Sequence, residues 1–472
     1  MPSRQDQLHS YQYSLQRVVA ALVTHDPDPH RSPLRRAGTT ALVSLVIAAL
    51  AVGGVAVWGL LTGASSDLPT NDAAVYVEKG TGARFIYNKT ENKLHPVLNF
   101  SSALLIANGQ APNVVSTTAK QLAKVQLGEP LGIPDAPDSL PDADNLLTAP
   151  WSVCTQAPAG TSTSSKPTST LLVGDTLADG TIAASTGAAL LVRDPADRTF
   201  LVVGNRRFLI AAGRYQETLR ALGWNDRQAW PVAAAWINAI PLGPELKPPT
   251  IPGLGEPSTV DSYRVGQVVT DAQTVDSKPT QSAVVLADGV AGVTEMQARM
   301  LRTVPGAPAP VPAGADFDHL PFSATRMSDA GEPNAMPSAV PDLATDVERA
   351  CMTLPAGKSG DGVRINPTIP TGSPASGATV PGGVQADLVH VARGRGAVIV
   401  SATSPSAPAE TGTITVITDT GLRYAVAGRE AVAKLGYGRR DLQQVPAELV
   451  ALLPQGPALD PVKARQSPPT GQ

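Results

Sequence analysis

The stretch ALVSLVIAALAVGGVAVWGLL, from Ala41 to Leu61, decides how the rest of this chain is organised. It contains no charged residue, and its flanks from Ala37 to Ser66 contain none either. At a rise of about 1.5 Å per residue, about 20 apolar residues cross the hydrocarbon core of a bilayer. The sequence therefore predicts one transmembrane helix within residues 39–62, which ties everything after Leu61 to a membrane.

Two other interpretations of this stretch fit its length less well. A cleaved signal peptide has an apolar region of about 7–15 residues. Here the apolar region is longer and follows 40 other residues, although the small residues from Ala64 to Ser66 suit a peptidase. A buried core helix does not require so long a stretch without charge. We expect an uncleaved span.

The charges beside the span predict its orientation. The first acidic residue after it is Asp67. The tail before it carries five arginines, three of them close to the span: Arg4, Arg17, Arg31, Arg35 and Arg36. Positive charge marks the cytoplasmic side of a membrane protein. The N-terminus is therefore expected in the cytoplasm and the C-terminal part outside it, with Trp58 as an anchor at the outer interface.

The tail, residues 1–38, contains a predicted amphipathic helix that would end at Asp26–Pro29. Its apolar residues recur at helical spacing: Leu8, Tyr11, Leu15, Val18, Val19 and Leu22. Such a helix lies on lipid or docks on a partner. Because few basic residues flank this one, we favour docking on a protein.

Composition limits the class of the part that follows the span. About 400 residues remain, enough for more than one core. The chain has 44 prolines and 42 glycines, and its aromatic residues make up 4%, which favours short strands and helices separated by many turns. The net charge is -3 and no stripe of Lys and Arg is present, so nucleic acid is not an expected partner.

Two cysteines, Cys154 and Cys351, both fall on the side predicted to be exported. In an oxidising compartment two thiols most simply form one disulfide, and this one would close a loop of nearly 200 residues. Two free thiols or bridges between molecules are the alternatives. A zinc site would lack nearby histidines.

An internal repeat is visible after the span. Leu222-Gly223-Trp224 recurs 213 residues later as Leu435-Gly436-Tyr437, and the pattern of Pro241, Gly243, Pro244 and Leu246 recurs at the same offset. Each copy follows a hairpin pattern, at 199–210 and at 413–426, and a helical stretch begins near Arg214 and Arg429.

Two weaker copies have the same plan, with coincidence as the alternative explanation. One pairs residues 74–77 with 84–87 and continues to a helix at 101–106; the other pairs 284–286 with 290–293 and continues to a helix at 294–303. Segments rich in Pro, Ser, Thr and Gly lie between the copies, at 130–170, 305–345 and 366–384, and each cysteine lies beside one of them.

These patterns divide the chain into nine predicted parts. They are a cytoplasmic tail (1–38), a transmembrane helix (39–62), a linker with repeat 1 (63–125), a first central segment (126–170), repeat 2 (171–250), repeat 3 (251–305), a second central segment (306–387), repeat 4 (388–461) and a disordered tail (462–472). A disulfide would join the two central segments in one core.

From about residue 4 to residue 461, the sequence resembles the EccB family, the membrane component of the type VII (ESX) secretion system of mycobacteria and related actinobacteria. The matching motifs are the N-terminal pattern from Arg4 to Gln16 before a single span, Leu131–Pro137, Trp151–Cys154, the repeat from Arg206 to Leu246, and Leu453–Pro461.

The resemblance implies an α+β fold in the inner membrane. It consists of a single-pass N-terminal transmembrane helix and an elongated periplasmic domain of four hairpin-plus-helix repeats, set around a central β-containing core with pseudo-twofold symmetry and a disulfide. It also implies assembly with the ATPase EccC, the multispanning EccD, EccE and further EccB copies.

Some members of that family are labelled ATPases, so nucleotide motifs need a direct test. Ala356-Gly357-Lys358-Ser359 resembles the end of a P-loop. The first glycine of that motif lies five residues before the second, where this chain has Met352. No apolar strand precedes the stretch, and the outer compartment normally lacks ATP. We therefore expect a loop and transfer the ATPase label to no residue.

Other candidate sites are equally incomplete. No Gly-x-Ser-x-Gly elbow is present, and the glycines at 394, 396, 436 and 438 do not complete a dinucleotide motif. Two acidic groups are better explained as hydrated loop charges than as metal ligands: Asp316, Asp318 and His319, and Asp135, Asp138, Asp142 and Asp144. We expect no catalytic residue, no cofactor and no metal.

Three functions fit these observations. The first is a structural subunit of a secretion membrane complex, which explains the span, the tail and the repeats together. The second is an anchor that binds the cell wall, for which few aromatic residues are available. The third is a nucleotide hydrolase of the same system, for which the motif is incomplete.

Overall fold

The computed structural model describes most of the chain. Described are residues 3–24, 33–61, 68–157, 166–177, 179–271, 274–275, 278–279, 281–314, 317–328, 330–332, 335–354, 362–378, 382–402, 408, 412–438 and 441–469. They fall into two compact units, residues 1–94 with 113–128 and residues 95–112 with 129–472, and each is described by itself.

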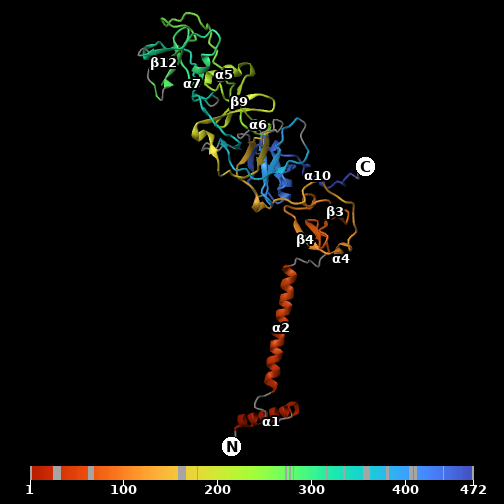
Figure 1. Cartoon of the computed structure of the whole chain (residues 1–472). Coiled ribbons are helices and arrows are strands. Elements are labelled where there is room, and N and C mark those ends of the chain that lie inside the picture. Colours follow the sequence, from red (N-terminus) through yellow and green to blue (C-terminus); the bar gives the residue numbers. More distant parts are fainter. Residues whose placement is uncertain are drawn as a thin grey trace. The chain divides into compact units, whose positions relative to one another are not determined.

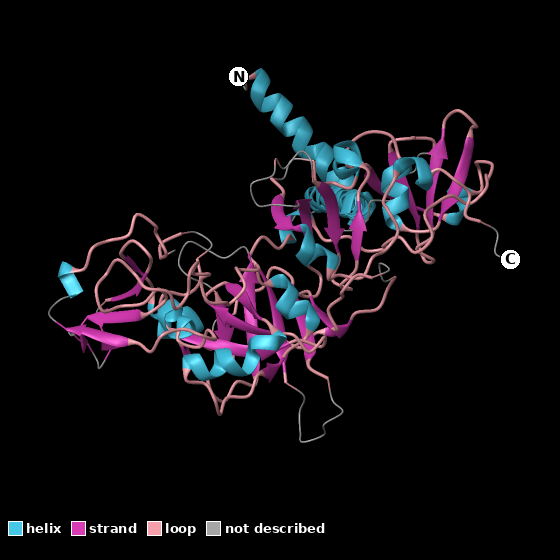
Figure 2. Cartoon of the chain, turned by 90° about the horizontal axis from the view of Figure 1, so that it is seen from above, coloured by secondary structure: helices cyan, strands magenta, loops and turns pink. Residues whose placement is uncertain are grey.

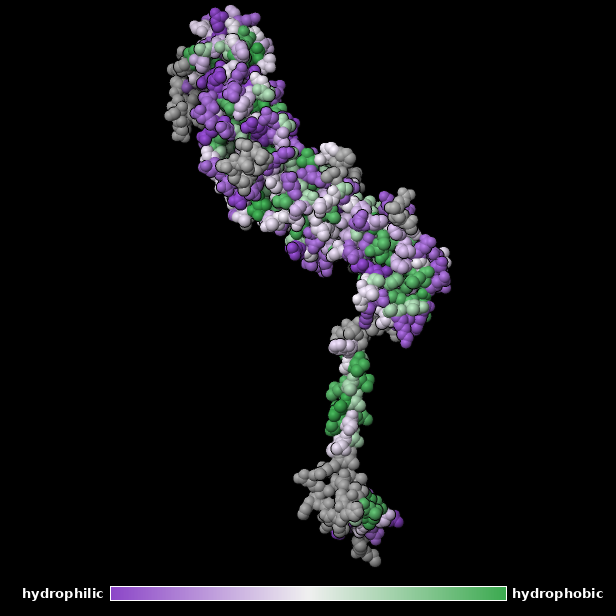
Figure 3. All heavy atoms as spheres, turned by 45° about the vertical axis from the view of Figure 1, so that its right-hand side comes forward, coloured by the Kyte–Doolittle hydropathy of each residue, from purple (hydrophilic) through white to green (hydrophobic). Residues whose placement is uncertain are grey.

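Two long helices open the chain: α1 (Arg4–Thr24) and α2 (Pro33–Leu61). Within α2, Gly38–Trp58 is the only segment of the described residues that is long and apolar enough to cross a membrane. Figure 3 shows the apolar surface of this helix in green. The helix begins at Pro33, before the predicted start at residue 39, because proline is well tolerated in a first helical turn. Asp26–Pro29 lies outside the described residues.

Four sheets share one strand order, and we call them modules 1 to 4. In each, a helix leads from the third strand to a fourth, which pairs in parallel with the first, so the order is third, second, first, fourth. Module 1 contains β1 (Ala74–Glu78), β2 (Arg84–Asn88), β3 (Lys93–Val97), α3 (Phe100–Ile106) and β4 (Asn113–Thr117). Module 2 contains β8 (Ala188–Arg193), β9 (Thr199–Val203), β10 (Arg206–Ile210), α5 (Tyr215–Leu222) and β11 (Trp230–Pro231).

The other two modules repeat this topology. Module 3 contains β12 (Val268–Asp271), β15 (Ser282–Val285), β16 (Val290–Gly292), α7 (Glu295–Leu301) and β17 (Val311–Gly314), with a small hairpin of β13 (Thr274–Val275) and β14 (Lys278–Pro279). Module 4 contains β23 (Ala397–Ala402), β24 (Thr413–Ile417), β25 (Arg423–Ala425), α8 (Gly428–Lys434) and β26 (Gln443–Pro446). Figure 2 shows the strands and short helices along the chain.

A short closing segment then pairs in parallel with the third strand of every module. The closing segments are residues 126–128, 241–243, 321–323 and 454–456, and their middle residues bridge to Leu94, Arg207, Val290 and Arg423. In each module the third strand donates one backbone hydrogen bond and accepts one, with donor–acceptor distances of 2.7–3.0 Å. The recurring Pro-x-Gly of the sequence is this closing segment in modules 2 and 4.

Gly243 of the closing segment is needed because an aromatic ring lies against it. A Cβ atom at this position would lie 2.5 Å from a ring carbon of Phe208. We expect Gly243→Ala to lower the free energy of unfolding by about 1–3 kcal/mol through overpacking, measured by urea titration. Gly213→Ala is the control, since nothing lies within 4 Å of its added Cβ. Equal losses in both variants would show that the close contact is unimportant.

A seven-stranded central sheet combines segments from both halves of the chain. Its order is β21-β22-β6-β5-β19-β20-β7. The strands are β5 (Trp151–Gln156), β6 (Thr168–Leu172), β7 (Thr181–Ile182), β19 (Arg349–Leu354), β20 (Val363–Ile365), β21 (Ser373–Pro374) and β22 (Leu388–His390). β7 pairs with β20 and β22 pairs with β6, so each half adds a strand to the other half. Figure 1 shows tan strands of the first half beside blue strands of the second half, near the label α6.

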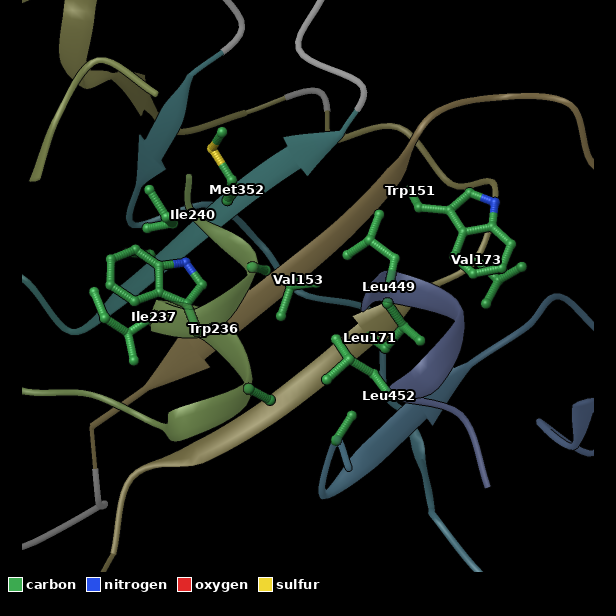
Figure 4. Close-up of a cluster of buried hydrophobic side chains, with 14 of the residues drawn as sticks. Trp151, Val153, Leu171, Val173, Trp236, Ile237, Ile240, Met352, Leu449 and Leu452 are labelled. Carbon is green, nitrogen blue, oxygen red and sulfur yellow. The ribbon is translucent and has the colours of Figure 1, made fainter. Parts of the chain in front are cut away.

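The largest apolar cluster lies on one face of this sheet, under α6 (Ala234–Ala239) and α9 (Ala447–Ala451). Figure 4 shows Leu449 from α9 beside Val153 and Leu171 of the strands, whereas Trp236 and Ile237 from α6 lie near Met352 of β19. Trp151, Val153 and Trp236 are completely buried. The strand alternation of two residues puts Cys154 on the opposite face, with Leu172 and Cys351.

The remaining elements are α4 (Ala119–Leu122), β18 (Asp342–Leu343) and α10 (Pro461–Ala464), with short 3-10 turns at Ala143–Asn145, Ala183–Thr186, Ala212–Arg214 and Phe317–His319. The helix α10 corrects the prediction that residues 462–472 form a disordered tail. Asp460 caps this helix through Val462 N–H, and Ala464 is fully buried because α10 packs on α3. The tail is folded as far as this helix.

A second correction concerns the weak repeat copy at 74–87. The sequence matches the hairpin of β1 and β2 with the one at 199–210, but β1 is the first strand of module 1, while Thr199–Val203 is the second strand of module 2. The true counterpart of Arg206–Ile210 is Lys93–Val97, whose strand character is masked in the sequence by Pro96.

Candidate functional site

The apolar face of α1 is the first candidate site. Leu8, Tyr11, Leu15, Val18 and Leu22 are each more than half exposed. The helix starts at a capping arrangement in which Ser3 Oγ donates to Asp6 at 2.8 Å and Asp6 N–H donates to Ser3 Oγ at 3.3 Å. The hydrogen bonds from Ser3 lower the pKa of Asp6. α1 therefore presents an apolar stripe of a kind that docks on a partner.

The second candidate is the junction of β5 and β19. Cys154 and Cys351 are direct antiparallel partners, and the structure joins them in a disulfide. Two residues away, the hydroxyls of Ser152 and Thr353 are 2.9 Å apart. These contacts tie together two strands that are far apart in the sequence.

Further polar contacts attach neighbouring elements to this junction. Ala233 N–H, just before α6, donates to Thr155 Oγ1 at 3.0 Å. Ser169 N–H donates to Asp387 at 2.7 Å, and Asp387 N–H donates back to Ser169 Oγ at 3.0 Å. Each contact links residues of different halves or layers, so the junction serves as the structural centre of its unit.

Two pockets share Arg193 as a lining residue, one within module 2 and one between module 2 and the central sheet. One of about 650 Å³ is lined by Arg193, Asp197, Arg198 and Tyr215 among others, and one of about 620 Å³ reaches Lys166 and Asp387. The charges at the turn neutralise one another, since Asp194 binds Arg198 at 2.7 Å and Arg193 lies 3.4 Å from Asp197. Among the lining residues that the structure describes, neither pocket has a histidine or a cysteine to act as a base or nucleophile.

The acidic residues that the sequence singled out are positioned for structural roles. Asp138 accepts a hydrogen bond from Phe100 N–H at 3.0 Å, and Asp142 accepts one from Asp144 N–H at 3.0 Å. Asp318 and His319 lie in the turn Phe317–His319, whereas Asp316 lies outside the described residues, as does the P-loop-like stretch at 356–359. The strand β19 ends at Leu354, just before that stretch, so the prediction that no strand precedes it is wrong. Within the described ranges, no three His, Cys, Asp or Glu side chains gather to hold a metal.

Two buried side chains, one at the end of α8 and one shortly after it, join module 4 to other parts of its unit. Lys434 Nζ donates to Ala107 O at 2.7 Å, and Tyr437 OH donates to Pro141 O at 2.5 Å. Burial lowers the pKa of Lys434 and raises the pKa of Tyr437. Sequence reasoning found Tyr437 as part of the repeat, but not the long-range hydrogen bond that its hydroxyl makes.

We expect Tyr437→Phe to lower the free energy of unfolding by about 1–3 kcal/mol, because Pro141 O loses its buried donor. The raised pKa also predicts a pH dependence. In the wild-type protein the unfolded chain ionises this group near its ordinary pKa of 10.0 while the folded chain keeps it neutral, so stability falls as the pH rises above about 10. The variant should show a shallower decline between pH 9 and 11 in urea titrations. An unchanged slope would contradict this assignment.

Three features together are typical of a membrane-anchored assembly protein: an apolar helix of membrane length, an exposed helical stripe and a disulfide-linked core. The chain belongs to the family described as type VII secretion system ESX-1, transport TM domain B, whose model matches residues 1–469.

Individual relatives and solved structures agree with this family. The chain is 28% identical to "ESX-3 secretion system ATPase EccB3" of Mycolicibacterium smegmatis, over 96% of this chain and 88% of the relative. It is 29% identical to "ESX-5 secretion system ATPase EccB5" of Mycobacterium tuberculosis, over 97% and 92%.

Among structures, it is similar to a chain of the periplasmic assembly from the ESX-5 inner membrane complex, with a TM-score of 0.65, 25% identity and coverage of 86% and 97%. A chain of the intact ESX-5 inner membrane complex shares the fold, with a TM-score of 0.67, 24% identity and coverage of 100% and 96%.

Proposed function

We propose that this chain is a structural and assembly subunit of a type VII secretion membrane complex, and that it supports protein export across the inner membrane. The observation that carries this proposal is the combination, in one family member, of a single membrane-length helix with a disulfide-linked folded part. The relatives carry the names of ESX systems, and similar chains come from an inner membrane complex and its periplasmic assembly.

We further propose that α1 is cytoplasmic and that the modules are periplasmic. The arginines before the span support this orientation through the positive-inside rule. The disulfide supports it independently, because disulfides persist in oxidising compartments and are rare in the cytoplasm.

The four modules are, in this proposal, repeats arranged with pseudo-twofold symmetry around the central sheet. Support comes from two equivalent backbone hydrogen bonds, each of which joins one half of the chain to a module of the other half. Leu147 N–H donates to Gly396 O at 2.7 Å, just before β23, and Ala344 N–H donates to Ala189 O at 2.9 Å in β8. Leu147 and Ala344 are 197 residues apart (344 − 147), the same separation as Cys154 and Cys351. The nine predicted parts stay within this proposal, with module 3 extended beyond residue 305 to include β17 and its closing segment, and with β7 assigned to the central sheet.

The partners in this proposal are further copies of the chain and subunits of the EccC, EccD and EccE types. A solved EccB3 dimer from the ESX-3 core complex has a chain of the same fold, with a TM-score of 0.65. The apolar stripe of α1 supplies a contact on the cytoplasmic side, and the modules supply contacts on the other.

The stripe is tested by weakening it without removing the helix. We expect Leu15→Ser combined with Val18→Ser to reduce the amount of complex recovered from native membranes through a C-terminal tag, because two exposed apolar contacts are lost. Gln16→Ser is the control on the same helix. Deletion of residues 4–23 should abolish recovery and secretion. Normal recovery and secretion after that deletion would contradict a docking role.

The relatives' names contain the word ATPase, which makes a nucleotide hydrolase the second candidate. We propose a role without enzymatic activity, since the P-loop-like stretch lacks its first glycine. The test is ATP hydrolysis by rigorously purified full-length protein. Activity that Lys358→Ala abolishes would overturn this part of the proposal.

A further inference from the structure

We propose that the closing segments of modules 1, 2 and 3 bind an extended, uncharged segment rich in Pro, Gly, Ser and Ala from a neighbouring subunit, which adds to them as an antiparallel β-strand. This inference deepens the assembly role and rests on it. Module 4 carries such a segment already, supplied by the chain itself.

The geometry of a closing segment leaves one residue facing outward. Its first and third residues exchange backbone hydrogen bonds with the third strand, as Pro241 O and Gly243 N–H do with Arg207 at 2.9 and 2.8 Å. Because backbone groups alternate in direction along an extended chain, the N–H and C=O of the middle residue point away from the module. The middle residues are Leu127, Leu242, Phe322 and Gln455.

In module 4 the outward edge is occupied. Gln455 forms an antiparallel bridge with Ala378, and its N–H donates to Ala378 O at 3.3 Å. The strand that supplies Ala378 comes from the sequence TGSPASGA at residues 371–378. Small residues are needed there, since a Cβ on Gly377 would lie 2.8 Å from Pro454 and 2.9 Å from Leu422.

In modules 1 to 3 the described residues place no strand on the same edge. Across the described ranges, no hydrogen bond uses the backbone N–H of Leu127, Leu242 or Phe322. These three residues are 58%, 59% and 77% exposed. A free strand edge beside an exposed apolar side chain is the feature that β-addition uses, because backbone bonds give affinity and the side chain gives specificity.

In this proposal the occupant comes from another polypeptide, since Ala378 of this chain is already paired in module 4. Module 4 also indicates its chemistry: small residues that permit close approach and no charge. Each edge offers one outward residue, so a single contact is weak. Subunits held in one complex have a high effective concentration, which makes such weak contacts sufficient.

The test places a photo-crosslinking amino acid at position 242 of the full-length chain in native membrane complexes. We expect cross-links to an extended stretch rich in Pro, Gly, Ser and Ala on another subunit, at least about tenfold above those from position 462. That control residue, Val462, is 65% exposed but lies on a helix. Cross-links to a helical or charged surface, or a yield no higher than the control, would overturn the proposal. A second copy of this chain supports it only if the cross-linked stretch has the stated composition.

Two substitutions separate backbone recognition from side-chain recognition. Leu242→Pro removes the outward N–H, and Leu242→Ala keeps it. Because Leu127 and Phe322 offer two further edges, the measurement is the number of labelled peptides with the sequence of residues 366–378 that one chain binds. We expect the proline variant to lower this number from about three to about two, and the alanine variant to weaken binding at this edge less. Leu242→Lys, which keeps the N–H but adds a charge, should also remove binding at this one edge if the proline variant fails to fold. Equal binding by wild type and the lysine variant would contradict β-addition. The amount of complex recovered through the C-terminal tag tests the assembly role independently of peptide binding.

Discussion

Replacing Cys154 and Cys351 together with alanine is expected to lower the free energy of unfolding of the central sheet by about 4 kcal/mol. The disulfide joins residues separated by 197 positions, and the chain-entropy model gives about 4–5 kcal/mol as an upper value for a loop of this length. The two strands it joins come from different halves, so its loss also frees the halves from one another. Urea titration of the full-length chain, followed by tryptophan fluorescence, measures the change.

A matched control uses the hydroxyl pair beside the disulfide. Ser152→Ala combined with Thr353→Ala removes a 2.9 Å contact between the same two strands but leaves the covalent link. We expect a loss of about 1 kcal/mol or less. If the cysteine pair cost no more than the hydroxyl pair, the disulfide would not be the structural centre described above.

The second large effect is expected for Trp236→Ala, at about 3–5 kcal/mol. Trp236 is completely buried, and α6 packs it against β5, β6 and β19 (Figure 4). Its ring Nε1 has no hydrogen-bond partner among the described residues, so its contribution comes from packing. Circular dichroism during thermal unfolding provides the measurement.

A phenylalanine at position 236 distinguishes the effect of ring size from the effect of the ring N–H. Trp236→Phe keeps most of the ring and removes the unpaired N–H, so we expect a loss of about 1.5 kcal/mol or less. Val462→Ala, at a residue 65% exposed, should change stability by about 0.5 kcal/mol or less. A phenylalanine variant as unstable as the alanine variant would point to a hidden partner of Nε1.

Local patterns in the sequence were sufficient for the span and for the tight hairpins. The uncharged run from Ala41 to Leu61 predicted a helix that the structure has within Pro33–Leu61. The hairpin pattern at 199–210 is a hairpin in the structure, in which Val203 pairs with Arg206. Both features depend on residues close together in the sequence, where length, charge and turn chemistry act directly.

Parallel pairing could not be predicted in this way. The strand β11 is two residues long, and it exists because it lies beside Val192 and Arg193 of β8. The closing segments are single bridges, visible in the sequence only as a recurring Pro-x-Gly with no stated role. Such contacts join residues that are tens of positions apart, so no local propensity encodes them.

Only part of the candidate site could be predicted, because its contacts also join residues that lie far apart in the sequence. Two cysteines indicated a disulfide but left free thiols and intermolecular bridges open, and it is the register of β5 against β19 that places Cys154 opposite Cys351. Asp138 gave no hint of its structural role, because its donor, Phe100 N–H, lies 38 residues away in the sequence.

The central claim is tested most directly by electron cryo-microscopy of the complex purified from native membranes through a tag on this chain. The account predicts particles that contain several copies of the chain, each contributing one helix that crosses the membrane, with the modules and the intact Cys154–Cys351 disulfide on the periplasmic side. Recovery of the chain only as isolated molecules, or with its modules in the cytoplasm, would contradict the account.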